Sequence, residues 1–101
     1  MLTLIAYLHA KPEKREALEQ VLQSLVEPTR LEADCIDYHF HRSVDDPNLF
    51  MFYENWRSRE SLDRHLAMPH LADFWEHRLD YLESDVDLQF FEMKSPLLVS
   101  I

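Results

Sequence analysis

The sequence predicts an α+β domain with the element order β-α-β-β-α-β. Three observations favour it: short runs rich in β-branched and aromatic residues, two segments with helical spacing of apolar residues, and turn-forming residues between them. At 101 residues the chain is expected to be a single domain spanning 1–101. Apolar residues make up 47% of it, which is more than a thin monomeric core needs. We therefore expect a subunit interface, with the apolar tail 94–101 packing on the partner subunit.

The first strand is predicted over residues 2–10, where both alternating faces are largely apolar. A strand covered on both sides gives this pattern. A helix is predicted to begin near Pro12, because proline is tolerated in the first helical turn. Apolar residues recur with helical spacing from Leu18 onward. Pro28 should kink or end this helix, and the stretch to residue 33 is expected to add a further turn or two.

The second and third strands are predicted over 35–43 and 49–57, joined by the turn residues 45–48. If Val44 pairs with Leu49, Glu54 lies opposite His39. One face of the hairpin then carries Asp37, His39, His41, Phe52, Glu54 and Trp56. The other face carries Ile36, Tyr38, Phe40, Met51, Tyr53 and Asn55.

The second half of the chain is predicted to begin with a helix over 59–67, for which Ser58 is a suitable N-cap. Pro69 interrupts it, and a second helical piece is expected over 70–82. The fourth strand is predicted over 86–93. This order is that of the ferredoxin-like fold, with an antiparallel sheet.

Composition excludes several functions. The formal net charge of -9 disfavours binding to nucleic acid and to anionic membranes. No run of about 18 apolar residues predicts a membrane span. The N-terminus lacks the features of a signal peptide, so the cytoplasm is expected. The chain has no glycine, which excludes glycine-rich phosphate loops and dinucleotide fingerprints. Cys35 is the single cysteine and is expected to serve in core packing rather than as a nucleophile.

The hairpin carries one group of candidate chemical residues. A histidine beside a carboxylate and a tryptophan suits acid/base chemistry, and it equally suits a hydrogen-bonded polar patch in a dimer interface. His39 and His41 are spaced to share a metal ion with Glu54, but the His-x-His signal is weak. We expect no metal here.

His65 and His70 form a second group, at the helix break made by Pro69. On the helix that follows, His70, Phe74, His77 and Tyr81 fall on one stripe. An apolar pocket with a few polar anchors has such a stripe. The alternative is that Phe74 belongs to the core and the histidines face water.

Several segments resemble the antibiotic biosynthesis monooxygenase family, especially its quinol monooxygenase members. The resemblance is densest at Phe-Tyr-Glu-Asn-Trp (52–56) and at His65 with Pro69-His70, and it extends over residues 2–93. It also includes the segments 26–30, 35–38 and 41–47. The resemblance implies a ferredoxin-like protomer whose sheet packs face to face with a second copy, giving a dimeric α+β barrel.

The resemblance also implies a range of activities. Characterised relatives oxidise quinols or polycyclic aromatics with O₂ without metal or flavin, others process phosphorylated signal molecules, and others degrade haem. Haem degradation is disfavoured, because its Asn/Trp/His set matches only Trp75 and His65 here. Relatives usually carry glycine where this chain has Asp34. We therefore expect a left-handed residue there, with some local strain.

We expect a cofactor-independent monooxygenase that oxidises a quinol or another electron-rich aromatic with O₂, working as a homodimer without cofactor or metal. His65 or His70 is the expected base, and Tyr53 or Asn55 the expected donor to the developing oxyanion. The expected substrate-binding residues are His41, Phe52, Glu54, Trp56, Phe74 and His77. The alternatives are isomerisation or degradation of a small carbonyl signal, and a non-catalytic dimeric ligand-binding module.

Overall fold

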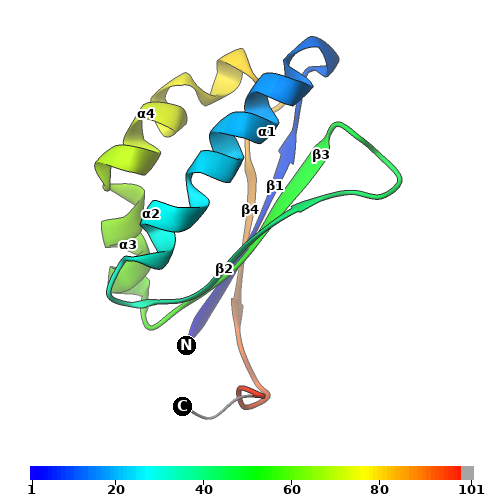
Figure 1. The fold of residues 1–101 in the computed structure, drawn as a ribbon. Helices are drawn as coiled ribbons and strands as arrows, with labels where there is room; N and C mark the ends of the chain where they lie inside the picture. The colour runs from blue at the N-terminus through cyan, green and yellow to red at the C-terminus, as the bar shows by residue number, and fades with distance from the viewer. Residues whose placement is uncertain (99–101) are drawn as a thin grey trace.

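The computed structural model describes residues 1–98 and confirms the α+β, ferredoxin-like fold. Its sheet has the order β2-β3-β1-β4, and each neighbouring pair is antiparallel. The elements in chain order are β1 (Leu2–His9), η1 (Pro12–Lys14), α1 (Arg15–Ser24), α2 (Val26–Arg30), β2 (Cys35–Arg42), β3 (Leu49–Trp56), α3 (Arg59–Leu66), α4 (Pro69–His77), η2 (Arg78–Asp80) and β4 (Asp87–Glu92). Figure 1 shows this arrangement.

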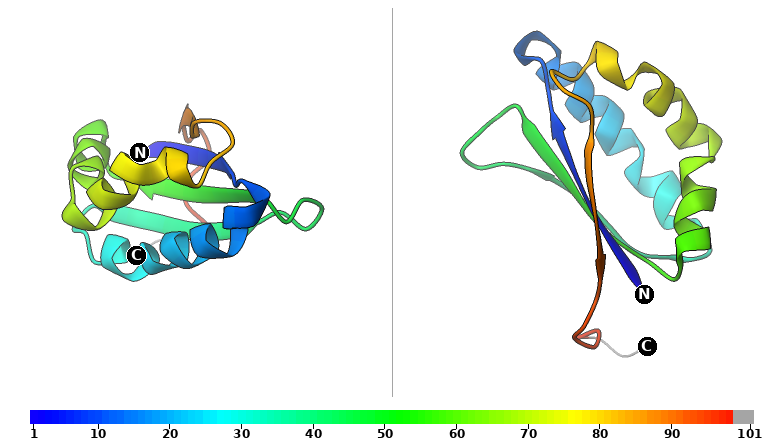
Figure 2. Two further views of the ribbon diagram at one scale, coloured as in Figure 1. Left: turned by 90° about the horizontal axis from the view of Figure 1, so that it is seen from above. Right: turned by 180° about the vertical axis from the view of Figure 1, so that it is seen from behind.

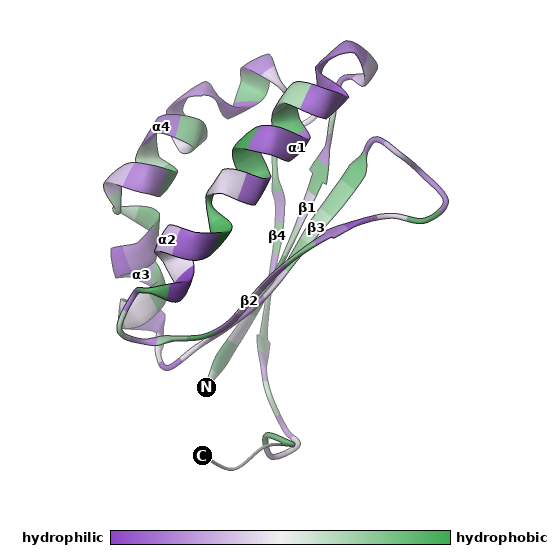
Figure 3. Ribbon diagram, viewed as in Figure 1, coloured by the Kyte–Doolittle hydropathy of each residue, from purple (hydrophilic) through white to green (hydrophobic). Residues whose placement is uncertain are grey.

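The helices all pack on one face of the sheet (Figures 1 and 2). The core lies between these two layers and contains buried hydrophobic residues of β1, β3 and the helices. Figure 3 shows how hydrophobic and hydrophilic positions are distributed along these elements. On β1, Leu4, Ala6 and Leu8 are buried under the helices. Ile5 and Tyr7 point to the other face and stay partly exposed. Burial was predicted for both faces of β1. In the single chain, the face under the helices is buried and the other face is partly exposed.

The helix break predicted at Pro28 is present, and the first helix ends four residues before this proline. Helix α1 ends at Ser24, and α2 starts at Val26 with Pro28 as its third residue. Proline clashes with the carbonyl group four residues before it, which here belongs to Ser24. The result is two short helices, and the second leads directly into the 31–34 connection.

The predicted register of the β2–β3 hairpin is wrong by one residue. His39 pairs with Tyr53, and Tyr38 pairs with Glu54. The cause is a longer loop: the Ser43 amide bonds the Leu49 carbonyl, which leaves Val44 outside the ladder and 97% exposed. The Ser43 hydroxyl accepts the amide hydrogens of Asp45 and Asp46, which closes the start of this loop.

That slip changes which residues of β2 share a face with which residues of β3, because side chains alternate along a strand. Glu54 lies under the helices and not beside His39. The helix-covered face of the hairpin carries Tyr38, Phe40, Phe50, Phe52, Glu54 and Trp56. The open face carries Asp37, His39, His41, Met51, Tyr53 and Asn55.

The helical second half differs from its prediction mainly in length. Ser58 caps α3 as expected, with its hydroxyl accepting the amide hydrogen of Ser61. Helix α4 ends at His77 and tightens into η2, short of the predicted end at residue 82. No helix within residues 1–98 is long and apolar enough to cross a membrane.

Asp34 is not the strained left-handed residue that was expected. No residue in the described range 1–98 has a positive φ. The Asp34 carboxylate instead accepts hydrogen bonds from Arg57 (3.2 Å), the Ser61 hydroxyl (3.0 Å) and Arg64 (2.7 Å). Asp34 therefore ties the 31–34 connection to the start of α3.

The C-terminal tail leaves the sheet after β4. Leu97 and Leu98 are exposed in the single chain, at 44% and 99%. Packing of the tail on a partner subunit stays a prediction, and its residues 99–101 lie outside the described range.

Candidate functional site

Three ionisable side chains meet where the helical layer turns from α3 to α4. His65 lies in the last turn of α3, and His70 follows Pro69 in the first turn of α4. Glu32 comes from the connection between α2 and β2. One carboxylate oxygen, Oε2 of Glu32, lies 2.8 Å from Nδ1 of His65 and 3.0 Å from Nε2 of His70. We call these three residues the Glu32 cluster.

Within the cluster, His65 packs against two aromatic rings. The His65 ring lies 4.6 Å from the Trp56 ring and 5.6 Å, edge to face, from the Tyr38 ring. The His65 side chain is 2% exposed and that of Glu32 8%. Burial lowers the pKa of His65 despite the opposing effect of Glu32, so the imidazole is neutral at neutral pH. In that state Nδ1 donates its hydrogen to Glu32.

His65 also borders a small cavity of about 40 Å³ between the sheet and the helices. Most of the cavity wall is aliphatic or aromatic, and its polar groups include those of Tyr38, Glu54 and His65. Because Nδ1 of His65 is held by Glu32, Nε2 is the ring nitrogen available to a molecule in the cavity. A carboxylate that orients one ring nitrogen of a histidine and leaves the other for proton transfer is a common acid/base arrangement.

Glu54 adds a second titratable group to this cavity. It is 4% exposed, and its Oε1 accepts a hydrogen bond from Nε1 of Trp56 at 2.8 Å. Burial raises the pKa of Glu54 to about 7; the Trp56 hydrogen bond lowers it and the charge of Glu32 raises it. Glu54 is therefore able to exchange a proton near neutral pH.

The expected donors Tyr53 and Asn55 lie on the open face of the sheet, away from the Glu32 cluster. Asn55 is 1% exposed and donates hydrogen bonds to Asp37 (2.9 Å) and to the Tyr53 hydroxyl (3.0 Å). Its side-chain oxygen accepts one from Thr3. Within a single chain the sheet separates these groups from His65.

The expected substrate-binding residues are divided in the same way. Phe52, Glu54 and Phe74 border the cavity, and Trp56 packs beneath His65. His41 is exposed on the open face. His77 is exposed on α4, with Nδ1 bonded to the Asp73 carbonyl oxygen. The predicted stripe on α4 therefore contributes Phe74 to the cavity and His70 to the Glu32 cluster.

Comparison with known proteins identifies the family. A family model described as "Antibiotic biosynthesis monooxygenase" matches residues 1–77. This chain belongs to the antibiotic biosynthesis monooxygenase family. The match includes the whole Glu32 cluster and all of the cavity wall up to Trp75.

Relatives of this family member support the assignment. "Putative monooxygenase Rv0793" of Mycobacterium tuberculosis is 37% identical over 71 residues, which is 70% of this chain and 69% of that protein. Its solved structure superimposes with a TM-score of 0.89, covering 94% of this chain and 96% of that one, at 27% identity. PA3566 from Pseudomonas aeruginosa has a TM-score of 0.88 at 36% identity and covers 93% of this chain and 94% of its own.

A third relative is longer than this family member. The uncharacterized protein sll1783 of Synechocystis is 34% identical over 83 residues, or 82% of this chain. The match spans 56% of the Synechocystis protein, a little over half its length.

Glu32 is the residue that sequence reasoning missed. It lies in the stretch up to residue 33, where a further helical turn was expected, and two more acidic residues, Asp34 and Asp37, follow it closely, so periodicity does not single it out. The only signal for Glu32 comes from the two histidines that flank the helix break, because buried histidines require a hydrogen-bond acceptor. Nothing in one sequence says which carboxylate supplies it.

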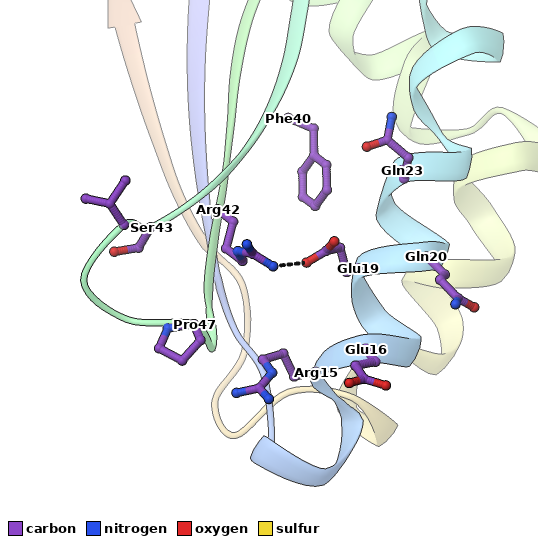
Figure 4. Close-up of a pocket in the computed structure, with 10 residues that line it drawn as sticks. Arg15, Glu16, Glu19, Gln20, Gln23, Phe40, Arg42, Ser43 and Pro47 are labelled. Atoms are coloured by element: carbon purple, nitrogen blue, oxygen red, sulfur yellow. Dashed lines mark hydrogen bonds and ion pairs between the residues drawn. The ribbon is translucent and has the colours of Figure 1, made fainter.

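A larger hollow of this family member lies elsewhere, between α1 and the loop after β2 (Figure 4). It is an open groove of about 1160 Å³, and its side chains include Arg15, Glu16, Glu19 and Arg42. Arg42 reaches across it to Glu19 at 3.0 Å. The Arg42–Glu19 pair is exposed to solvent, so we place the chemistry at the smaller apolar cavity.

Proposed function

We propose that this family member is a cofactor-independent monooxygenase that oxidises a quinol or a similarly electron-rich aromatic with O₂. The observation that carries the proposal is the Glu32–His65 pair at the wall of an apolar cavity. The relative Rv0793 is described as a monooxygenase, and the family name supports the same reaction class.

In this proposal, His65 begins the reaction as a base. Nε2 of His65 takes the proton of a substrate hydroxyl, and Glu32 holds Nδ1–H and stabilises the imidazolium that forms. His65 sits against Trp56 and Tyr38, so little water competes for Nε2. The resulting aryloxide is the electron donor to O₂.

The overall reaction balances without any added reductant. The aryloxide and O₂ form a carbon–oxygen bond, which gives a hydroperoxide at a ring carbon. The O–O bond then breaks: one oxygen atom stays on carbon, and the other leaves as water with the proton lost from that carbon and one more proton. For a quinol this gives a hydroxyquinone and one water, and all four electrons taken up by O₂ come from the substrate.

Glu54 is the proposed acid for the departing oxygen. Its carboxyl group borders the cavity, and its raised pKa of about 7 keeps a large protonated fraction at neutral pH. A leaving hydroxide in an apolar cavity requires such a proton. Trp56 orients the Glu54 carboxyl group through the hydrogen bond at 2.8 Å.

The size and charge of the cavity restrict the substrate. A space of about 40 Å³ holds one or two water molecules, so an aromatic substrate requires the helices to move away from the sheet. The cavity wall contains no lysine or arginine. A phosphorylated signal molecule would bury its phosphate there without a cationic partner, and the cavity therefore favours a neutral aromatic.

We also propose that the open face of the sheet forms a homodimer. This face has no covering element among residues 1–98, and it carries the apolar side chains of Ile5, Tyr7, Met51 and Phe91. Phe91 is 47% exposed in the single chain. When two copies bury such a patch between them, the interface resembles a domain core cut in half. Phe91→Asp is expected to give monomers by sedimentation velocity; an unchanged dimer contradicts the use of this face.

Oxygen uptake tests the proposed activity. EDTA-treated protein is mixed with a panel of quinols such as menadiol under ¹⁸O₂, and uptake is compared with the autoxidation blank. We expect enzyme-dependent uptake and a product containing one ¹⁸O atom. His65→Ala should lower the rate about 100-fold or more, because general base catalysis contributes about 10²–10⁴-fold.

His77→Ala is the matched control, since His77 is exposed and lies outside the cavity. It should retain the wild-type rate. Uptake equal to the blank across the panel contradicts the monooxygenase proposal. If quinols then raise the melting temperature without forming product, the protein is a ligand-binding module.

A further inference from the structure

We propose that Glu32, His65 and His70 form a binding site for one divalent transition-metal ion of the Zn²⁺ class. Each residue supplies one donor atom, and the three atoms lie within 4.8 Å of one another. They come from three separate segments: the connection after α2, the end of α3 and the start of α4. The proposal concerns binding, and it stands independently of the proposed oxidation.

The distances already approach those of a coordination sphere. Nitrogen and carboxylate oxygen bind Zn²⁺ at about 2.0–2.2 Å, so two donors at adjacent positions lie about 3.0–3.5 Å apart. Oε2 of Glu32 lies 2.8 Å from Nδ1 of His65 and 3.0 Å from Nε2 of His70. Shifts of under about 1 Å would therefore admit an ion between the three donors.

The donor types select the ion. Two imidazoles and one carboxylate suit Zn²⁺, Co²⁺, Ni²⁺ and similar ions. Ca²⁺ and Mg²⁺ prefer six or more oxygen ligands, which this cluster does not supply. The net charge of -9 raises the local concentration of cations. His70 is 21% exposed and gives a path from solvent, and the Thr29 hydroxyl, 3.3 Å from Nε2 of His70, is placed to support a further ligand.

The ion takes the place of the hydrogens that hold the cluster together in the metal-free chain. Both ring nitrogens must present lone pairs to it, so the hydrogen of His65 moves from Nδ1 to Nε2. Nε2 is then a donor and no longer accepts a proton. A bound ion is thus incompatible with the proposed base role of His65, and this consequence alone rests on the proposed function.

Co²⁺ spectroscopy tests the binding directly. Metal-free full-length protein is titrated with Co²⁺, and the visible absorption bands of the ion report its coordination. We expect one Co²⁺ per chain with intense low-symmetry bands, and their loss on addition of Zn²⁺. Glu32→Gln and His70→Ala should each lower the affinity at least tenfold. The His70 variant changes a partly exposed side chain, so it tests the site even if the Glu32 variant folds poorly.

Two control variants each remove one histidine, as His70→Ala does, but outside the cluster. His77→Ala and His39→Ala each delete one exposed imidazole, and both should bind Co²⁺ as the wild type does. The proposal is overturned if the wild type does not bind Co²⁺, or if the Glu32 and His70 variants bind it as tightly as the wild type. Loss of binding in His39→Ala overturns it as well. Where quinol oxidation is measurable, Zn²⁺ should inhibit it and a chelator should restore it. If no oxidation occurs, the Co²⁺ spectra still decide the metal site.

Discussion

Glu54 should make the stability of this protein fall as pH rises from about 4.5 to 7. Burial raises its pKa from 4.5 in the ordinary case to about 7 in the folded chain. Between these values the unfolded chain has lost the proton and the folded chain still holds it. The free energy of unfolding therefore decreases with pH in this window and levels off above it. The full contribution is present below pH 4.5 and is lost above pH 7.

The size of the effect follows from the two pKa values. A difference of about 2.5 corresponds to about 3 kcal/mol, a large part of the 5–15 kcal/mol that stabilises a typical domain. Glu54→Gln keeps an oxygen that accepts the Trp56 hydrogen bond and removes the titration. Between pH 4.5 and 8, the free energy of unfolding of this variant should rise by about 3 kcal/mol relative to that of the wild type.

Urea unfolding at several pH values measures this difference. With a slope of about 1–2 kcal/mol per molar urea, the midpoint of the variant should move by about 2 M relative to wild type across the window. Glu83→Gln is the control, because Glu83 is exposed and its curve should stay parallel to wild type. A parallel curve for Glu54→Gln as well would refute the burial argument.

Three further outcomes follow from other contacts. Asp34→Gly should lower the melting temperature by several degrees, because Asp34 bonds Arg57, Ser61 and Arg64 and has no positive φ for glycine to relieve; a higher melting temperature would contradict this. Ser58→Ala should cost about 1 kcal/mol in urea unfolding through loss of the α3 cap, and an unchanged midpoint would count against the cap. Leu22→Ala should cost about 2–5 kcal/mol in the same assay, since Leu22 is fully buried, and a cost under 1 kcal/mol would mean that the core collapses around the gap.

The features of the fold that the sequence predicted are those that one residue determines through its near neighbours in the chain. Pro28 and Ser58 act on residues within four positions of themselves, so the helix break and the helix cap were visible in the sequence. The hairpin register was not, because it depends on whether Val44 is in the loop or in the ladder. The Ser43 hydroxyl decides this through two bonds to backbone amides, and a serine at that position has other options.

The candidate site was predictable only in part, for the same reason. His65 and His70 stood out because they flank Pro69, and Phe52, Glu54 and Phe74 were expected at the pocket that they now border. Tyr53 and Asn55 were grouped with them, although the sheet separates the two sets. Glu32 was missed because its partners are more than thirty positions away in the sequence, and no local pattern encodes such a contact.

The single oxygen shared by His65 and His70 links substrate entry to base strength. In the proposed mechanism, a substrate that enters by displacing α4 would draw His70 away from Glu32. The carboxylate then has one imidazole to stabilise where it had two, and its full negative charge acts on His65. An imidazole with an undivided anionic partner holds a proton more tightly. Under the proposed function, admission of the substrate would thus strengthen the group that is to deprotonate it.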